Sequence, residues 1–535
     1  MPRFRAGLAA AALVLVIAGA SILGISRVLA AGQTPPGPDR NAVITVDYTS
    51  YEWWLVAWAD SSVQCQIFTD HDGVPTNAEI YQSCGEDIYD EWLQTQPCDL
   101  AEKDPAACPG DYLQLAGSSA AQKKIGVTLP SPSVWVTLEG CTAVDLTNRC
   151  DRLPSLVLTG EEPLPNEHIT SIGGTLDGKP FSCDPICQVD LVPTDEAGVR
   201  IEFWAYSSYG DSSVVLDAQV RVAAGQGANA RYWYADVIST QWRGAPQAAC
   251  SQTWNAFPPV GGPPEWLSTP QRAEDLASNI PYDYLAANLI TQGVVDASTC
   301  PDGGLLANGL ASPCGIAQAQ PAVDEWQNRF DDEIFSAALK SDIPAQLLKN
   351  LFSRESQFWP GVFTDRPEVG LGQLTDNGAD TTLLWNPSFY EQYCPLVLAD
   401  SFCQTGYALL EPEQQAVLRG ALVRSVDATC NDCPIGLDLT QADFSVSVFA
   451  ETLAANCEQA GRIVENASGQ TPGTASSYED LWRFTLVNYN AGPGCLTLAS
   501  QATVEQGEDL NWENVSSNLT PACQPAVDYV DTISR

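Results

Sequence analysis

Two patterns of hydrophobic and polar residues divide the chain into a β-rich part and a helical part. From about residue 41 to 223, hydrophobic residues alternate with polar ones, and β-branched and aromatic types dominate, as in AVITVDY, SVWVTL and GVRIEFWAYSS. A period of two predicts strands, because it gives each strand one hydrophobic face. These runs and the turn signals between them predict a β-rich module at 41–110 and a β-sandwich at 124–223.

Beyond the β-rich part the hydrophobic period changes to three or four residues. In AVDEWQNRFDDEIFSAALK this spacing relates Trp326, Phe330 and Ile334, which predicts a helix. Residues 224–320 are rich in proline and glycine and contain short helical patterns, so we expect a bridge that packs onto the next domain. The predicted fold is multidomain: all-β sandwich modules that resemble immunoglobulin-like modules, then this bridge, then a mainly α domain at 321–535.

The first 40 residues have the pattern of an export segment. Two arginines precede an uncharged apolar run from Ala6 to Ser26, and small residues follow it. About 20 apolar residues can also span a bilayer, so residues 1–31 are either a cleaved signal peptide or an N-terminal membrane anchor. Residues 32–40 then form a linker. Both alternatives predict an extracytoplasmic protein, secreted or anchored to the cell membrane by an N-terminal helix.

Eighteen cysteines fit an exported protein, because an oxidising compartment favours disulfides. Their even number allows up to nine pairs, and we expect one of them to staple the loop from Cys300 to Cys314. The motifs CDPIC and CNDC also favour disulfides over zinc sites, since the chain has only two histidines. We therefore expect no metal and no other cofactor.

The charge balance argues against one class of partner. The chain has 66 acidic and 25 basic residues and a net charge of −41. Such a charge repels phosphate backbones and anionic lipid headgroups within the Debye length. Nucleic acid is therefore not an expected partner.

Two aromatic clusters occur in the β-rich part, YEWWLVAW at 51–58 and YWYADVISTQW at 232–242. Exposed aromatic rings can stack on sugars, which is one interpretation of these clusters. Aromatic residues are also favoured in the packed interior of sheets. We expect packing within the strands to explain both clusters.

The stretch SRESQFWP, residues 353–360, places Glu355 beside aromatic residues. On a continuous helix, Phe358 and Trp359 would share a face with its carboxyl group at i+3 and i+4. Apolar surroundings raise the pKa of a carboxyl group, as proton donation near neutral pH requires. A single helical glutamate is usually a solvated surface charge, however, so this stretch alone does not establish a catalytic acid.

Two further motifs follow Glu355 in the chain. GLGQ begins fifteen residues later at Gly370, and NYNAGPG spans Asn488 to Gly494 at the end of a predicted helix. With ESQFWP, these motifs are similar in order and spacing to the three signatures of the soluble-type lytic murein transglycosylases, which are lysozyme-like enzymes. The resemblance covers about residues 321–500 and implies a lysozyme-like α domain that acts on the glycan strands of peptidoglycan.

The resemblance implies a reaction with one protein carboxyl group. Glu355 would protonate the glycosidic oxygen at C1 of N-acetylmuramic acid, and the 2-acetamido carbonyl of the sugar would stabilise the cation. Deprotonated Glu355 would then activate the 6-hydroxyl of the same sugar, giving a 1,6-anhydro product. Such substrate assistance is an exception to the two-carboxylate rule of glycosidases.

The resemblance also implies a set of residues that bind the sugar or support the acid. Gln373 would line the cleft, and Tyr489 and Asn490 would hydrogen-bond the acid or the saccharide. Ser356 would support the acid, and Thr364 would supply a hydroxyl group. Each has a structural alternative, since Gln373 can cap a turn, Tyr489 can be a core residue, and NAGPG can be a helix C-cap.

The sequence departs from the family pattern in three places. Gly372 stands where the family usually has methionine, which we expect to remove a large side chain from the cleft. Asn488 replaces the usual alanine before Tyr489. The chain between Gln373 and Tyr489 is long and cysteine-rich, so we expect a disulfide-stapled insertion near 390–440 that lids or extends the cleft.

Two alternatives to transglycosylation remain. The sequence SRES and the acids that follow it also resemble goose-type lysozymes, which hydrolyse the same bond, and Asp365, Glu368 or Asp376 would then hold the attacking water. The other alternative, from a different class, is a non-catalytic wall-binding protein with a degenerate lysozyme-like domain. The retention of Glu355 with both of the other motifs favours an enzyme.

Overall fold

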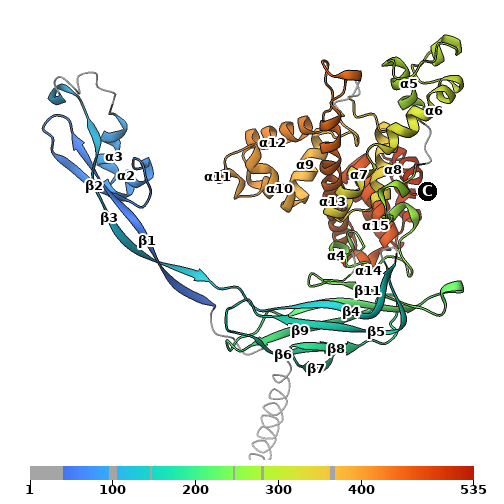
Figure 1. The fold of residues 1–535 in the computed structure, drawn as a ribbon, viewed down its shortest axis with the longest axis horizontal. Coiled ribbons are helices and arrows are strands. Elements are labelled where there is room, and N and C mark those ends of the chain that lie inside the picture. Colours follow the sequence, from blue (N-terminus) through green and yellow to red (C-terminus); the bar gives the residue numbers. More distant parts are fainter. Residues whose placement is uncertain (1–39, 96–104, 145–146, 245–247, 279–281, 362–367) are drawn as a thin grey trace, which may run out of the picture. The chain divides into compact units, whose positions relative to one another are not determined.

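The computed structural model describes residues 40–95, 105–144, 147–244, 248–278, 282–361 and 368–535. These residues form two compact units. The first comprises residues 40–131 with the segments Glu162–His168 and Tyr209–Ser212, and the second comprises the other described residues from Pro132 to Arg535. A β-sandwich region with sheets of three and eight antiparallel strands precedes a mainly helical region (Figure 1).

The described strands form two sheets. The smaller has the order β2-β1-β3, and the larger has the order β4-β5-β11-β10-β9-β6-β7 with β8 paired to β5. The strands are β1 (Asn41–Ala57), β2 (Val63–Thr69), β3 (Asp111–Thr128), β4 (Ser133–Val144), β5 (Thr147–Glu161), β6 (Ile169–Leu176), β7 (Lys179–Cys183), β8 (Ile186–Asp190), β9 (Val199–Ser207), β10 (Leu216–Ala224) and β11 (Trp233–Ile238). The period-two pattern therefore predicted a strand-rich region. The expected bounds of the modules are wrong, because β3 spans the gap between 110 and 124 and pairs with β1, and β11 lies beyond 223.

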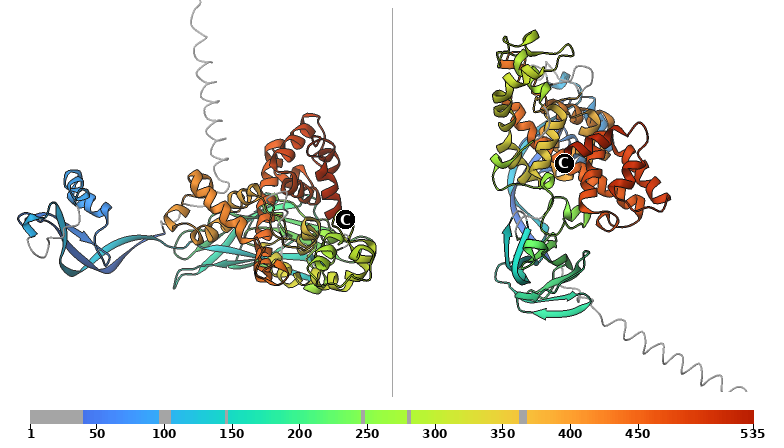
Figure 2. Two further views of the ribbon diagram at one scale, coloured as in Figure 1. Left: turned by 90° about the horizontal axis from the view of Figure 1, so that it is seen from above. Right: turned by 90° about the vertical axis from the view of Figure 1, so that its right-hand side faces the viewer.

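Two helices in the first unit correct the expectation of an all-β N-terminal part. Helix α2 (Asn77–Cys84) begins with a capping box between Thr76 and Glu79, and α3 (Glu86–Leu93) follows directly. Both helices lie on one side of the three-stranded sheet (Figure 2), and Ile80 packs there with Leu55 and Ile67 in a small core. The disulfide between Cys65 and Cys84 links α2 to β2.

The eight-stranded sheet encloses its own hydrophobic core. Leu158, Ile172, Phe203 and Val220 are fully buried in it. Trp233 and Trp242 pack against the same core, so packing within the strands is confirmed for these members of the second aromatic cluster.

The helical region contains one long helix surrounded by shorter ones. The helices are α4 (Ser251–Trp254), α5 (Asp283–Thr291), α6 (Pro313–Asn328), α7 (Asp331–Ser341), α8 (Ala345–Ser356), α9 (Asp376–Trp385), α10 (Pro387–Tyr393), α11 (Asp400–Cys403), α12 (Pro412–Ser425), α13 (Leu439–Ser468), α14 (Pro472–Ala475), α15 (Tyr478–Ala491), α16 (Pro493–Glu505), α17 (Trp512–Ser517) and α18 (Pro525–Ile533). Helix α13 contacts α7, α9, α15 and α16 (Figure 1) and so organises the core of this region.

The bridge expected at 224–320 packs into this helical core. Trp254 is fully buried, and its indole Nε1 donates a hydrogen bond to the Cys457 carbonyl at 3.0 Å. Its ring meets that of Trp482 edge-on, with centroids 5.1 Å apart. A disulfide from Cys250 to Cys457 fixes the same segment to α13. From residue 248 the expected bridge therefore belongs to the helical region. Its first part does not, because it carries β11 of the eight-stranded sheet, so the expected end of the β-sandwich at 223 is wrong.

Eight disulfides join described cysteines, in keeping with the expected disulfide-rich chain. The expected pair Cys300–Cys314 is confirmed, and the cysteines within CDPIC and within CNDC pair with each other. The predicted export segment at 1–31 and linker at 32–40 lie outside the described residues. In the part of the chain that the structure covers, no helix is both long and apolar enough to cross a membrane.

Candidate active site

Glu355 lies in the last turn of α8, where the chain leaves the helix. Gln357 and Phe358 both have left-handed backbone conformations, with φ of 48° and 62°. The helix therefore ends at Ser356, and the expectation that Phe358 and Trp359 extend its face beyond Glu355 is wrong. Trp359 instead stacks on Trp326, with ring centroids 5.2 Å apart, and both Trp359 and Phe358 are buried in the core.

The carboxyl group of Glu355 meets a tyrosine from the C-terminal helix. The Tyr529 hydroxyl, on α18, donates a hydrogen bond of 2.5 Å to Glu355 Oε1. Burial raises the pKa of Glu355 to about 7, and the nearby charge of Glu368 raises it too, whereas Tyr529 and Arg354 act in the opposite direction. Arg354 points to Asp528, 3.1 Å away. A substantial fraction of Glu355 is therefore protonated at neutral pH.

The GLGQ motif forms a tight turn beside this acid. Leu374 N–H donates to the Val369 carbonyl at 2.8 Å, which closes the turn. Gln373 adopts a left-handed conformation with φ of 52°, and its amide Nε2 donates to the Gly370 carbonyl at 2.5 Å. Non-glycine residues in this region of φ are uncommon and cluster at functional sites. The turn therefore holds the side chain of Gln373 in one orientation.

Gly372 does not open the cleft as expected, because another side chain occupies the space. A Cβ atom on Gly372 would lie 2.4 Å from Phe449 Cδ1 and 2.8 Å from the Tyr489 hydroxyl. Phe449 is a fully buried residue of α13. Its ring fills the place that a side chain at position 372 would need, so the glycine reflects close packing rather than a wider cleft.

The NYNAGPG motif ends α15 at the cleft. The Tyr489 hydroxyl donates to the Gly372 carbonyl at 2.6 Å, so this tyrosine bonds the GLGQ turn rather than Glu355. Asn488 is buried, and its amide nitrogen donates to Asn456 and Gln459 of α13, each at 2.8 Å. An alanine at 488 would have no group for these bonds, so the asparagine side chain links α15 to α13.

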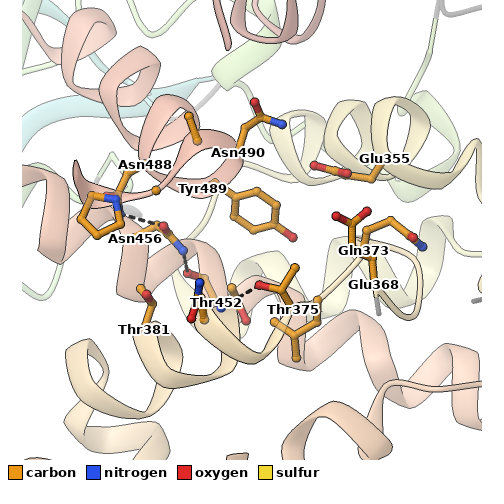
Figure 3. Close-up of a pocket in the computed structure, with 16 residues that line it drawn as sticks. Glu355, Glu368, Gln373, Thr375, Thr381, Thr452, Asn456, Asn488, Tyr489 and Asn490 are labelled. Carbon is orange, nitrogen blue, oxygen red and sulfur yellow. Dashed lines mark hydrogen bonds between the residues drawn. The ribbon is translucent and has the colours of Figure 1, made fainter. Parts of the chain in front are cut away.

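The three motifs meet at one cavity of about 360 Å³. Figure 3 shows Glu355, Glu368 and Gln373 together at one end of it, with Asn456 and Asn488 at the other end. The remaining lining residues are Leu374, Thr375, Asn377, Gly378, Thr381, Thr452, Tyr489, Asn490, Ala491, Gly492 and Pro493. Apart from the two glutamates the lining is uncharged, which suits a neutral polar ligand.

Other predicted residues are placed differently. Ser356 is buried outside the cavity lining, and its hydroxyl donates to the Phe352 carbonyl at 3.2 Å. Asp376 is exposed, near Arg419. Thr364 and Asp365 lie outside the described residues. The described lining residues include none from the expected insertion at 390–440, although a disulfide between Cys394 and Cys403 does staple that segment.

Tyr529 is the functional candidate that sequence reasoning missed. It lies 174 residues after Glu355 in the chain and belongs to none of the three motifs. The disulfide between Cys495 and Cys523 joins the start of α16 to the segment before α18. That link ties the end of the NYNAGPG motif to the helix that carries Tyr529.

No protein-family model matches the sequence, and a search of curated proteins gives no match. The candidate site therefore depends on the geometry described above and on the similarity of three short motifs.

The hydrogen bond from Tyr529 stabilises the charged form of Glu355. Replacing Tyr529 with phenylalanine removes this bond and should raise the pKa of Glu355 further. If Glu355 is the proton donor, glycan cleavage falls as the pH rises through its pKa of about 7. The Tyr529→Phe variant should shift this fall to higher pH. A misplaced acid should also lower the maximal rate by about tenfold.

Rate profiles between about pH 5 and pH 9 measure this shift. Tyr478→Phe is the matched control, because it removes another buried hydroxyl, bonded to the Ala249 carbonyl at 2.7 Å, from the same region. The control should keep the wild-type pH profile. An unchanged or downward-shifted profile in Tyr529→Phe contradicts the assigned role.

Proposed function

We propose that this protein is a lytic transglycosylase that cleaves the β-1,4 bond between N-acetylmuramic acid and N-acetylglucosamine in peptidoglycan. One observation carries the proposal: a glutamate with a pKa near 7 lies in a cavity that the ESQFWP, GLGQ and NYNAGPG motifs build together. A carboxyl group in this state can both donate and accept a proton at neutral pH. A shared cavity also argues against a chance match of three separate motifs.

In the proposed reaction, protonated Glu355 transfers its proton to the glycosidic oxygen as the C1–O bond breaks. The leaving sugar departs as an alcohol, and the 2-acetamido carbonyl oxygen bonds to C1 and stabilises the cation as a cyclic oxazolinium ion. The Glu355 carboxylate then takes the proton from the 6-hydroxyl, whose oxygen attacks C1 and displaces the acetamido oxygen. The products are a 1,6-anhydromuramic end and a free N-acetylglucosamine end, and Glu355 regains its proton.

The wall residues have roles that follow from their bonds. Tyr489 and Gln373 hold the GLGQ turn together through the carbonyl groups of Gly372 and Gly370. Asn490 is exposed on the rim of the cavity and can bond sugar hydroxyls. The uncharged amides and hydroxyls at the other end suit an N-acetylated sugar, which has amide and hydroxyl groups of its own.

A second candidate function is hydrolysis of the same bond, and the position of Glu368 favours it. The three acids considered for holding a water are Asp365, Glu368 and Asp376. Among the described residues, Glu368 lines the cavity and Asp376 lies outside it. A carboxylate near Glu355 can orient a water toward C1 in place of the sugar 6-hydroxyl. We keep transglycosylation as the first proposal, because Glu355 suffices for both proton transfers.

Mass spectrometry of the products distinguishes the two reactions. Digestion of purified peptidoglycan by the wild-type protein should release fragments with 1,6-anhydro ends, which lack one water relative to reducing ends. Glu368→Gln should leave these products unchanged if the reaction is a transglycosylation. Reducing ends that decline in Glu368→Gln would instead establish hydrolysis, and the absence of any fragments from a folded wild-type protein would remove the enzyme proposal.

The finer fold and the location are also part of the proposal. We infer that the eight-stranded part is immunoglobulin-like and that the helical region around α13 is lysozyme-like. The paired cysteines are consistent with an oxidising compartment. The protein would then work outside the cytoplasm on peptidoglycan, either secreted or tethered by residues 1–31.

A further inference from the structure

The three-stranded sheet of the first unit has one covered face and one open face. Leu55, Ile67 and Ile80 form the core between the covered face and helices α2 and α3 (Figure 2). Side chains alternate between the two faces of a strand, so the neighbours of Leu55 and Ile67 point the other way. We call that side the open face, and its central strand residues are Glu52, Trp54, Val56, Gln66, Phe68, Tyr112 and Gln114, with Trp58 in ring contact with Tyr112.

The first aromatic cluster is therefore split between the two faces. Trp53 packs inward against the small core, as expected. Trp54 and Trp58 lie on the open face, where Phe68 has 61% of its surface exposed. Core packing thus does not explain the aromatic residues on this side. Phe68 is exposed, and Trp54, Trp58 and Tyr112 are partly exposed. Accessible aromatic rings gathered on one sheet face are typical of a binding surface.

The strand register sets three of these rings in a diagonal line. Phe68 lies opposite Glu52, Trp54 is two residues further along β1, and Tyr112 lies opposite Val56, two residues beyond Trp54. From Phe68 to Trp54, and again from Trp54 to Tyr112, the line passes to the next strand and moves two residues along it. Neighbouring ring positions are therefore about 8 Å apart. Such a line suits an extended, repetitive ligand better than one compact molecule.

The rings on the open face are held in place before any ligand binds. The Trp54 indole Nε1 donates to Glu52 Oε1 at 2.7 Å, which restrains the indole ring. Trp58 and Tyr112 stack on each other with centroids 4.1 Å apart and planes inclined by 34°. Restrained rings lose little conformational entropy on binding, so the surface is preorganised.

The chemistry of the open face points to an uncharged polysaccharide. Aromatic rings pack against the C–H faces of sugar rings, while the amides of Gln66 and Gln114 can donate to and accept from hydroxyl groups. The only charged side chain among the central positions is that of Glu52, which accepts the hydrogen bond from Trp54, and the chain as a whole carries −41, so nucleic acid and anionic lipid are disfavoured.

We propose that the open face is a glycan-binding surface on which Trp54, Phe68 and Tyr112 stack sugar rings of one extended β-linked strand. The choice of the cell-wall glycan as that strand rests on the proposed function, whereas the preference for a neutral polysaccharide does not. Binding here would hold the protein on its polymeric substrate independently of the cavity around Glu355.

Binding of the full chain carrying Glu355→Gln to insoluble peptidoglycan and to chitin beads tests this proposal without turnover. Replacing both Trp54 and Phe68 with alanine should raise the apparent Kd for both polymers by about tenfold or more, since two stacking contacts are lost. Replacing both with tyrosine should largely retain binding. Tyr81→Ala is the matched control, because Tyr81 is 48% exposed on α2, beside the covered face.

Unchanged binding by the folded Trp54→Ala/Phe68→Ala protein would overturn the proposal. A second result would also overturn it: the protein with Trp54 and Phe68 intact binds phosphatidylcholine vesicles, and the Trp54→Ala/Phe68→Ala variant does not. That result would assign the open face to membrane binding. Cleavage of short soluble glycan fragments by the Trp54→Ala/Phe68→Ala variant with Glu355 intact should equal that of the wild type. The two proposals thus fail separately. If the wild type does not cleave glycan, the proposed enzyme activity is wrong; if the Trp54→Ala/Phe68→Ala variant binds the polymers unchanged, the proposed glycan-binding surface is wrong.

Discussion

Glu355→Gln should abolish glycan cleavage, with a loss of about 10³-fold or more in rate. The glutamine keeps the shape of the side chain but has no proton to donate to the glycosidic oxygen and cannot accept one from the sugar hydroxyl. General acid and base catalysis each contribute about 10²-fold to 10⁴-fold, and one residue supplies both here. Release of soluble fragments from peptidoglycan measures the loss.

The same variant should fold normally and bind glycan. Because the pKa of Glu355 is raised to about 7 in the folded protein, the folded state resists ionisation of this group, and its stability falls as the pH rises from about 4.5 to about 7. A glutamine has no such penalty. Thermal unfolding near pH 8 should therefore show a melting temperature equal to or above that of the wild type.

Glu368→Gln is the matched control for Glu355→Gln. It changes a carboxyl group in the same cavity, and it should retain cleavage if the reaction is the proposed transglycosylation, in which Glu355 is the proton donor. If Glu355→Gln still cleaves peptidoglycan at near wild-type rates, the assignment of the acid is wrong. If neither the wild type nor the variant cleaves but both bind, the protein is a wall-binding protein.

Gly372→Met should destabilise the protein and stop cleavage, although methionine is the usual residue in the family that the motifs resemble. A side chain at 372 would overlap Phe449 and the Tyr489 hydroxyl. Overpacking of a filled core costs about 1–3 kcal/mol, and the displaced tyrosine would release the GLGQ turn from α15. Chemical denaturation gives the change in stability, and fragment release gives the change in activity.

The collision with Phe449 can be tested by removing it. Phe449→Ala alone should cost about 3–5 kcal/mol, because it leaves a cavity at a fully buried position. In the double variant Gly372→Met/Phe449→Ala the methionine would fill part of that cavity. The double variant should therefore lose less stability than the sum of the losses in the two single variants. Additive costs, or a stable Gly372→Met single variant, would contradict the packing described.

Gly420→Ala is a suitable control for the glycine substitution. A Cβ atom at 420, in α12, meets no atom within 4 Å, and alanine is favoured over glycine inside a helix by about 1 kcal/mol. This variant should match or exceed the wild type in stability and keep full activity. The contrast isolates the close contact at 372 from the general effect of adding a methyl group.

The sequence by itself determined the strand-rich and helix-rich parts, because periods of two and of three to four residues are local consequences of backbone geometry. It also determined which acid to examine, since the order and spacing of ESQFWP, GLGQ and NYNAGPG can be read directly from the chain. The Cys300–Cys314 staple was equally local, because few residues separate its partners.

Only the tertiary structure decided what surrounds each candidate residue. Tyr529 reaches Glu355 across 174 residues, and Phe449 reaches Gly372 from another helix, so neither contact has a periodic signal. Trp53 and Trp54 are adjacent in sequence yet lie on opposite faces, and the placement of α2 and α3 decides which face is covered. Local preferences set the elements, but packing between distant elements sets burial, and burial raises the pKa of Glu355.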